Sequence, residues 1–259
     1  MEPGPQPCKL TVITVVFNAA ELLEPTIASV RKTDFPQVEY IVIDGGSVDG
    51  TLDVIQDNAD KIDTWVSDRD KGLYDAMNKG LNMANGQFVW FVNAGDIISS
   101  ADIIQKILAA INDDTDIIYG EVMIIDAEGK ELGTRSELTT QKLPEGLNWK
   151  SFRYGMRVSH QGFIVRKSIA PQYELNNLSA DIEWCIRCLQ KSRKNVLVPG
   201  IFVHYLKGGI SKKKWKKSIM DRYKILAKYY GFFPNLCAHI GIMTRAVFHK
   251  ILRINKISY

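Results

Sequence analysis

The chain has 259 residues, of which 46% are hydrophobic and 24% are charged, and this balance excludes a disordered chain. Its length allows one large α/β domain or a domain with an appendage. No apolar run approaches the roughly 20 residues of a membrane span, and the proline-rich start lacks the apolar core of a signal peptide. We therefore expect a cytoplasmic protein.

Charge is divided unevenly along the chain. Residues 207–259 hold 13 Lys and Arg against one acid, Asp221, so they carry +12 and leave −8 on the first 206 residues. This asymmetry predicts an acidic body, residues 1–210, and a basic helical extension, residues 211–259. The partner of the extension should be anionic.

Short strands and helices alternate in the first half of the chain. Helices are expected over residues 20–31, from residue 51 onward and over residues 73–83. The apolar runs that predict buried strands lie at residues 9–17, 39–44, 62–66 and 87–93. This alternation predicts an α/β fold with a doubly wound, mostly parallel sheet.

The pattern changes beyond residue 96. A hairpin is expected to turn near residues 127–129, and the polar stretch 136–157 can form a mobile loop over a site. The other expected elements are helices over residues 103–111 and 178–190 and strands over residues 160–165 and 196–203. The second half should therefore add a small antiparallel sheet, followed by C-terminal helices.

Two acids stand at the ends of buried strands. Asp44 is followed by GGSVDGT, whose glycines let the backbone turn sharply but lack the spacing of a dinucleotide-binding fingerprint. Asp96 ends an apolar run at the edge where open α/β sheets bind ligands. A carboxylate there suits a hard divalent cation that carries phosphate oxygens. The pattern therefore indicates nucleotide chemistry.

Four segments in order, ITVVFN, IDGGSVDGT, DKGLYDAMNKG and FVNAGD, resemble family 2 glycosyltransferases, which have the Rossmann-like GT-A fold. The last two segments are similar to a bacterial branch that builds cell-surface polysaccharides. The resemblance covers residues 9 to about 211 and implies a nucleotide-binding half (about 9–96) and an acceptor-binding half (about 97–210). It implies a hexosyltransferase that moves a sugar with inversion from a nucleotide-diphosphate donor, with a UDP-sugar favoured, to a lipid-linked saccharide.

The resemblance also implies donor-site residues. Val15 and Phe17 should line the nucleobase slot, Asp44 should bond the base or ribose, and Lys71 should contact the base or diphosphate. The segment Asn93-Ala94-Gly95-Asp96 takes the place of the DxD motif, in which Ala94 and Gly95 face the nucleotide. This segment departs from the family pattern, because only Asp96 supplies a carboxylate to Mn²⁺ or Mg²⁺.

On the acceptor side, the resemblance implies that Asp181 is the base that deprotonates the attacking hydroxyl. Two alternatives stay open: Asp181 favours the positive end of a helix dipole, or Glu183 is the base. His160 and Gln161 are implied as acceptor contacts, although a histidine there can also be structural. His204 can complete the metal shell or be a hydrogen-bonded core histidine.

The basic extension has an apolar helical face bordered by lysines, formed by Trp215, Ile219, Tyr223, Leu226 and Tyr230. A basic amphipathic helix with a tryptophan suits an anionic membrane surface, which predicts peripheral binding at the inner face of the plasma membrane. The alternative is that this face packs on the catalytic domain. No nucleic-acid-binding module is recognisable, so nucleic acid is not expected as a partner.

Two other functions remain as alternatives. The incomplete DxD motif is compatible with a non-catalytic nucleotide-sugar-binding scaffold held at the membrane. A nucleotidyltransferase on a related fold would need a basic nucleotide-binding loop near the start of the chain. The segment ITVVFNAAE has no Lys or Arg, which argues against that second alternative.

Overall fold

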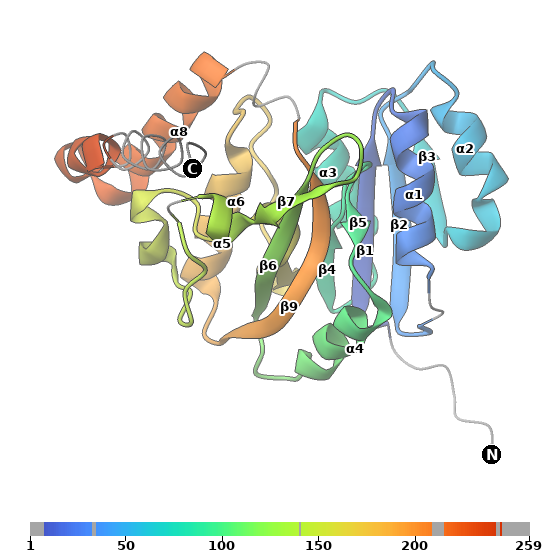
Figure 1. Ribbon diagram of the computed structural model, residues 1–259, viewed down its shortest axis with the longest axis horizontal. Coiled ribbons are helices and arrows are strands. Elements are labelled where there is room, and N and C mark those ends of the chain that lie inside the picture. Colours follow the sequence, from blue (N-terminus) through green and yellow to red (C-terminus); the bar gives the residue numbers. More distant parts are fainter. Residues whose placement is uncertain (1–7, 33–34, 140, 209–214, 242–243, 245–259) are drawn as a thin grey trace, which may run out of the picture.

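The structure is a computed structural model that describes residues 8–32, 35–139, 141–208, 215–241 and 244. Within these residues nine strands form one sheet, which passes through the centre of the molecule (Figure 1). The strand order is β3 (Thr64–Ser67), β2 (Val38–Asp44), β1 (Leu10–Val16), β4 (Phe88–Phe91), β8 (Phe163–Arg166), β6 (Ile117–Ile125), β9 (Asn195–Leu206) and β5 (Ile97–Ile98), with β7 (Glu131–Thr134) paired to β6.

The first four strands in this order are parallel, so their carboxyl ends lie at one edge. In this register Asp44, the last residue of β2, lies opposite Val16 of β1 and Ser67 of β3. All seven residues of β1 are buried, because helices cover both faces of the sheet. The loops that follow these strands therefore meet in one place.

Two hydrophobic cores lie on the two faces of the sheet. One face packs against α1 (Ala20–Val30), α2 (Thr51–Asp57) and α4 (Ala101–Ala110). The other packs against α3 (Leu73–Met83), α6 (Ala180–Lys191) and α8 (Trp215–Tyr230). The short helix α5 (Arg135–Leu138) follows β7. This arrangement confirms the predicted doubly wound α/β fold.

The second half differs from the prediction in its details. β8 pairs antiparallel with both β4 and β6, so the antiparallel strands continue the parallel sheet rather than form a sheet apart from it. His160–Gly162 is a 3₁₀ turn, and the strand begins only at Phe163. The turn fits closely over β6, since a Cβ on Gly162 would stand 2.5 Å from the Gly120 carbonyl oxygen.

The part of the extension that the structure describes packs on the body. Ile225 and Leu226 of α8 join the core beneath α6, whereas Ile219 is 49% exposed. The buried face of α8 thus keeps Leu226 of the predicted face and also includes Ser218 and Asp221. The Asp221 carboxylate accepts a hydrogen bond from the Leu178 N–H, and the Ser218 carbonyl accepts one from the Ser179 hydroxyl, both before α6. Among the described residues, every helix is too short or too polar to cross a membrane.

Candidate active site

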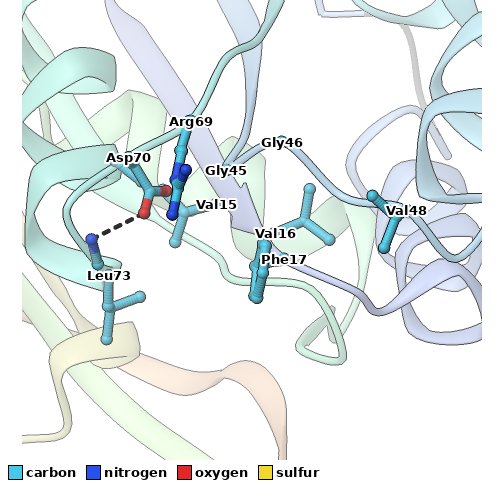
Figure 2. A pocket seen from close by; sticks show the side chains of 11 residues that line it. Val15, Val16, Phe17, Gly45, Gly46, Val48, Arg69, Asp70 and Leu73 are labelled. Carbon is cyan, nitrogen blue, oxygen red and sulfur yellow. Dashed lines mark hydrogen bonds between the residues drawn. The ribbon is translucent and has the colours of Figure 1, made fainter.

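A cavity of about 710 Å³ opens where the loops after β1, β2 and β3 meet (Figure 2). Two residues predicted for the nucleobase slot are in its wall: Val15, which is buried, and Phe17, which is 60% exposed. A large exposed aromatic ring beside a cavity offers a stacking surface for a planar ligand. The full lining consists of Val15, Val16, Phe17, Gly45, Gly46, Val48, Arg69, Asp70, Gly72, Leu73 and Ala76.

Arg69 and Asp70 belong to this wall, although the sequence analysis did not select them. They come from the loop between β3 and α3, and Figure 2 shows both side chains beside Gly45. One oxygen of Asp70, Oδ1, accepts a hydrogen bond of 2.8 Å from the backbone N–H of Gly72. The sequence did offer a way to find them. Neighbouring parallel strands end at the same edge of a sheet, so the segment SDRD, residues 67–70 at the end of β3, lies at the same edge as Asp44.

Asp44 lies beneath the cavity rather than in its lining. Its carboxylate is fully buried and accepts hydrogen bonds from the backbone N–H groups of Gly46 and Ser47, at 3.2 and 3.0 Å. The hydroxyls of Ser47 and Ser67 also donate to it. Asp44 therefore organises the Gly45–Ser47 turn, and its predicted contact with a base or ribose stays a prediction.

Lys71 is exposed and lies outside the cavity lining. Its backbone N–H donates to Oδ2 of Asp75 at 3.0 Å, at the start of α3. The structure thus fixes the backbone of Lys71 and records no contact of its side chain with the wall. Its role at the base or diphosphate also stays a prediction.

Asp96 closes a tight turn that α1 holds in place. The Thr26 hydroxyl donates to the Asp96 carbonyl at 2.9 Å and accepts from the Gly95 N–H at 3.0 Å. Gly95 has a φ of +95°, a left-handed backbone conformation that favours glycine. Ala94 donates its N–H to the Val15 carbonyl at 3.3 Å, which ties the turn to the wall of the cavity. The predicted residues Ala94, Gly95 and Asp96 therefore adjoin the cavity.

The carboxyl group of Asp96 is 4% exposed, and this burial raises its pKa to about 7. Hydrogen bonds from the Gln161 side chain and from the Asn93 and Leu206 backbones act in the opposite direction. Gln161 is itself oriented by the Ser159 hydroxyl, which donates to its Oε1 at 2.8 Å. The structure thus brings Gln161, predicted as an acceptor contact, to Asp96.

The oxygens around Asp96 fit a hard divalent cation. Asn93 Oδ1 is buried, and within the described chain no hydrogen-bond donor reaches it. Asp96 supplies a carboxylate whose charge is poorly solvated, and a cation would stabilise that charge. However, no group of three or more His, Cys, Asp or Glu side chains suited to a metal gathers among the described residues. A cation here would therefore depend on ligands from a substrate, as Mg²⁺ bound to phosphates does.

His204 lies on β9 opposite Ile97, the residue that follows Asp96. Its Nε2 is 3.2 Å from Oε1 of Glu131 on β7. The imidazole therefore has a carboxylate partner of its own. A place for His204 in a metal shell stays a prediction.

His160 lies inside the protein. Its ring is 6% exposed, packs against Phe91 and Trp184, and bonds through Nε2 to the Tyr173 hydroxyl at 2.7 Å. Burial lowers the pKa of His160 to about 4, so the ring is neutral at pH 7. This geometry matches the structural alternative for His160, and its predicted contact with an acceptor stays a prediction.

The two acids of α6 have different surroundings. Glu183 is 5% exposed and accepts hydrogen bonds from Lys228 Nζ at 2.7 Å and from the Tyr229 hydroxyl at 3.0 Å. Asp181 is half-buried at the start of α6, and its Oδ1 accepts from the Ile182 N–H at 2.9 Å. Glu183 is thus engaged in holding α8, which leaves Asp181 as the better candidate for proton transfer.

Burial raises the pKa of Asp181, whereas the Ile182 N–H, the positive charge of Arg222 and the Tyr74 hydroxyl favour the ionised form. A carboxyl group with a raised pKa is a stronger base than an ordinary aspartate. Arg222 comes from α8, so the helix that was assigned to the extension contributes to the electrostatics of the site.

Burial raises the pKa of the Tyr205 hydroxyl, and the negative charges of Asp96 and then Asp181 raise it further. The segment before α6 is tied to α3, because the Tyr74 hydroxyl donates to the Leu178 carbonyl at 3.4 Å. Leu73, the residue before Tyr74, lines the cavity. The structure thus places the cavity, the turn at Asp96 and the start of α6 at one end of the sheet.

Comparison with known proteins agrees with this arrangement. A family model described as Glycosyl transferase family 2 matches residues 11–173. A PGL/p-HBAD biosynthesis glycosyltransferase of Mycobacterium tuberculosis is 31% identical over 187 residues, which cover 69% of this chain and 68% of that protein. An uncharacterized glycosyltransferase of the same species is 29% identical over 184 residues, with the same coverage of both chains.

Solved structures share the fold at lower identity. Residues 1–349 of S. aureus TarS in complex with UDP-GlcNAc give a TM-score of 0.67 at 19% identity, covering 84% of this chain and 64% of that one. The mannosyltransferase PcManGT of Pyrobaculum calidifontis, in complex with GDP-Man and Mn²⁺, gives 0.61 at 12% identity, covering 96% and 80%. This chain thus spans somewhat less than two thirds of the TarS fragment.

Proposed function

The chain belongs to glycosyl transferase family 2, and on this premise we propose that it moves a sugar with inversion from a nucleotide-diphosphate sugar to a saccharide acceptor. The observation that carries the proposal is the hydrogen bond from the Ala94 N–H to the Val15 carbonyl, which joins the turn at Asp96 to the wall of the cavity. Asp96 serves the donor, and Asp181 at the start of α6 serves the acceptor. The favoured donor is a UDP-sugar, as in the TarS complex.

The residues of the chain divide the work between donor and acceptor. The base enters the cavity beside Phe17, and the diphosphate lies toward the turn that ends at Asp96. Asp96, with Asn93 Oδ1, would hold a Mn²⁺ or Mg²⁺ that offsets the charge of the leaving diphosphate. Asp181 takes the proton from the attacking hydroxyl. The oxygen of this acceptor hydroxyl forms the new bond to the anomeric carbon as the bond between that carbon and the diphosphate breaks.

The test of this proposal is nucleotide release from a panel of UDP-, GDP- and TDP-sugars, followed by transfer to saccharide acceptors. Release from one donor by the wild-type chain supports the proposal. Transfer that inverts the anomeric configuration, read by NMR of the product, supports the direct displacement. Retention of configuration would contradict the role of Asp181 as a base for an attacking acceptor hydroxyl.

A lipid-linked acceptor at the inner face of a bacterial membrane is part of the same proposal. Its support is a set of exposed apolar side chains on α8 and on helical residues 232–241. These helices lie at one end of the molecule (Figure 1). Lys224 lies exposed on α8. Basic groups beside exposed apolar ones suit an anionic lipid surface. The apolar side chains concerned are Ile219, Met220, Phe232, Phe233, Leu236 and Ile240.

Vesicle flotation tests this surface. The chain should float with vesicles that contain anionic lipid and stay behind with purely zwitterionic ones. Replacing both Phe232 and Phe233 with Ser should abolish flotation, whereas replacing the exposed Leu175, which lies outside these helices, should not. Flotation that does not change with these substitutions would contradict the assignment.

A further inference from the structure

Gly45 and Asp70 occupy complementary positions in the wall of the cavity. A Cβ on Gly45 would stand 2.4 Å from Oδ2 of Asp70 and 3.3 Å from Cδ2 of Phe17. The end of β2 therefore leaves no room for a side chain at residue 45. The space is filled instead by a carboxylate from the loop after β3, beside the exposed aromatic ring of Phe17.

The carboxylate of Asp70 is held in one orientation. Its Oδ1 accepts from the Gly72 N–H at 2.8 Å, as the dashed line in Figure 2 shows. For Oδ2, none of the described residues provides a hydrogen-bond donor, and the atom lies against Gly45, which lines the cavity as Asp70 does. A fixed acceptor thus remains available to a ligand. Arg69, from the same loop, lines the cavity next to it.

An ionised carboxylate accepts hydrogen bonds and cannot donate them. Uracil and thymine carry an N–H at N3, and guanine carries one at N1. These groups lie in the plane of the ring, on the Watson–Crick edge, which remains accessible when the face of the base is stacked. Cytosine and adenine place an acceptor nitrogen at the same position. A carboxylate therefore attracts uracil, thymine and guanine and repels cytosine and adenine. The attraction and the repulsion both contribute to specificity for the base.

We infer that Asp70 selects the nucleotide of the donor, accepting the ring N–H of uracil, thymine or guanine through Oδ2 while the base stacks on Phe17. This inference rests on the proposed function and specifies the base of its donor. The glycine at 45 is what lets the carboxylate approach the base.

Calorimetric binding of UDP, GDP, CDP and ADP to the full chain tests this assignment. The wild-type chain should bind UDP or GDP at least about tenfold more tightly than CDP or ADP, the discrimination expected from one hydrogen bond to a charged group. Asp70→Asn keeps an oxygen for the Gly72 N–H and places an amide N–H₂ toward the cavity. It should lose about tenfold in UDP affinity and gain affinity for CDP.

Two further measurements separate base recognition from a general disturbance of the loop. N3-methyl-UDP lacks the donor, so it should bind the wild-type chain as weakly as CDP does. Gly45→Ala adds a Cβ that displaces the Asp70 carboxylate and should weaken UDP as Asp70→Asn does. The matched control is Asp68→Asn, an exposed acid of the same loop outside the cavity lining, which should leave all affinities unchanged.

Each other outcome overturns a different claim. Unchanged UDP affinity in Asp70→Asn, or CDP bound by the wild-type chain as tightly as UDP, overturns the role of Asp70 and leaves the proposed function standing. Absence of binding by every nucleoside diphosphate, with the chain folded by circular dichroism, overturns the proposed function together with this inference.

Discussion

The Nζ atom of Lys228 lies 2.7 Å from the Oε1 atom of Glu183, and this pair joins α8 to α6. The Tyr229 hydroxyl donates to the same oxygen at 3.0 Å. Because Glu183 is buried, its charge needs these partners to remain in the protein interior. The pair therefore explains both how α8 is attached and why Asp181, two residues earlier, is the acid left for chemistry.

Lys228→Met should destabilise the fold, because it leaves the buried Glu183 carboxylate with fewer hydrogen bonds. We expect a loss of about 1–3 kcal/mol in the free energy of unfolding, measured by urea denaturation. Lys224→Met, which removes an exposed lysine of the same helix that is not a hydrogen-bond partner of Glu183, is the matched control and should change little. Adding Glu183→Gln to Lys228→Met should recover part of the loss. A double variant less stable than the single one would contradict this coupling.

Asp181→Asn should retain donor affinity and lose transfer, because the amide cannot take the proton of the acceptor hydroxyl. The loss expected for a general base is about 10²–10⁴-fold in kcat. Glu183→Gln, the matched substitution on the same helix, should retain turnover once its stability is accounted for. Near-normal turnover by Asp181→Asn would remove this residue from the mechanism.

Arg222→Gln should move the pH profile of the reaction. The positive charge of Arg222 favours the ionised form of Asp181, so its removal raises the pKa of Asp181 further. A general base works only when deprotonated, and activity falls as the pH drops through its pKa. The acid limb of kcat/KM should therefore shift to higher pH in this variant. An unchanged limb, with Lys224→Met as the control, would show that Asp181 does not set it.

His160 should make stability depend on pH. Its pKa is about 4 in the folded chain against about 6.5 when unfolded, so the unfolded state binds more protons between these values. Stability is then fully present above pH 6.5 and is lost as the pH falls toward 4, by roughly 1–2 kcal/mol between pH 6.5 and 5. In His160→Phe this component should vanish from urea-denaturation curves. An identical pH dependence in both chains would contradict the neutral, buried state of His160.

Local patterns predicted most of the fold. The apolar run before Asp96 and the amphipathic pattern of residues 73–83 identified β4 and α3, because burial on both faces and helical periodicity are recorded in neighbouring residues. The strand expected at residue 160 begins at Phe163 instead. The close fit of the preceding turn over Gly120 depends on a strand 40 residues away, and local periodicity does not contain it.

The candidate site was predicted only in part, because some of its residues are brought together by contacts between distant segments. Val15 and Phe17, which the resemblance to family 2 glycosyltransferases implied for the nucleobase slot, are in the cavity wall. Asp70 was missed, since its importance comes from the space at Gly45, which only the packing of two loops reveals. The apolar face predicted for α8 was right at Leu226, which is buried, and wrong at Ile219, which is 49% exposed. The polar residues Ser218 and Asp221 are buried instead, and the Asp221 carboxylate accepts a hydrogen bond from the Leu178 N–H before α6.

The central claim is that this chain cleaves a nucleotide-sugar at a donor site that includes Asp96. The most direct measurement is nucleotide release from UDP-, GDP- and TDP-sugars, in Mn²⁺ and then in EDTA, by the wild-type chain and by Asp96→Ala. We predict release from one donor, with UDP-sugars favoured, that EDTA and Asp96→Ala each abolish. Tight binding of a nucleotide-sugar by calorimetry with no release, with or without metal and acceptor, would contradict the claim and indicate a binding protein instead.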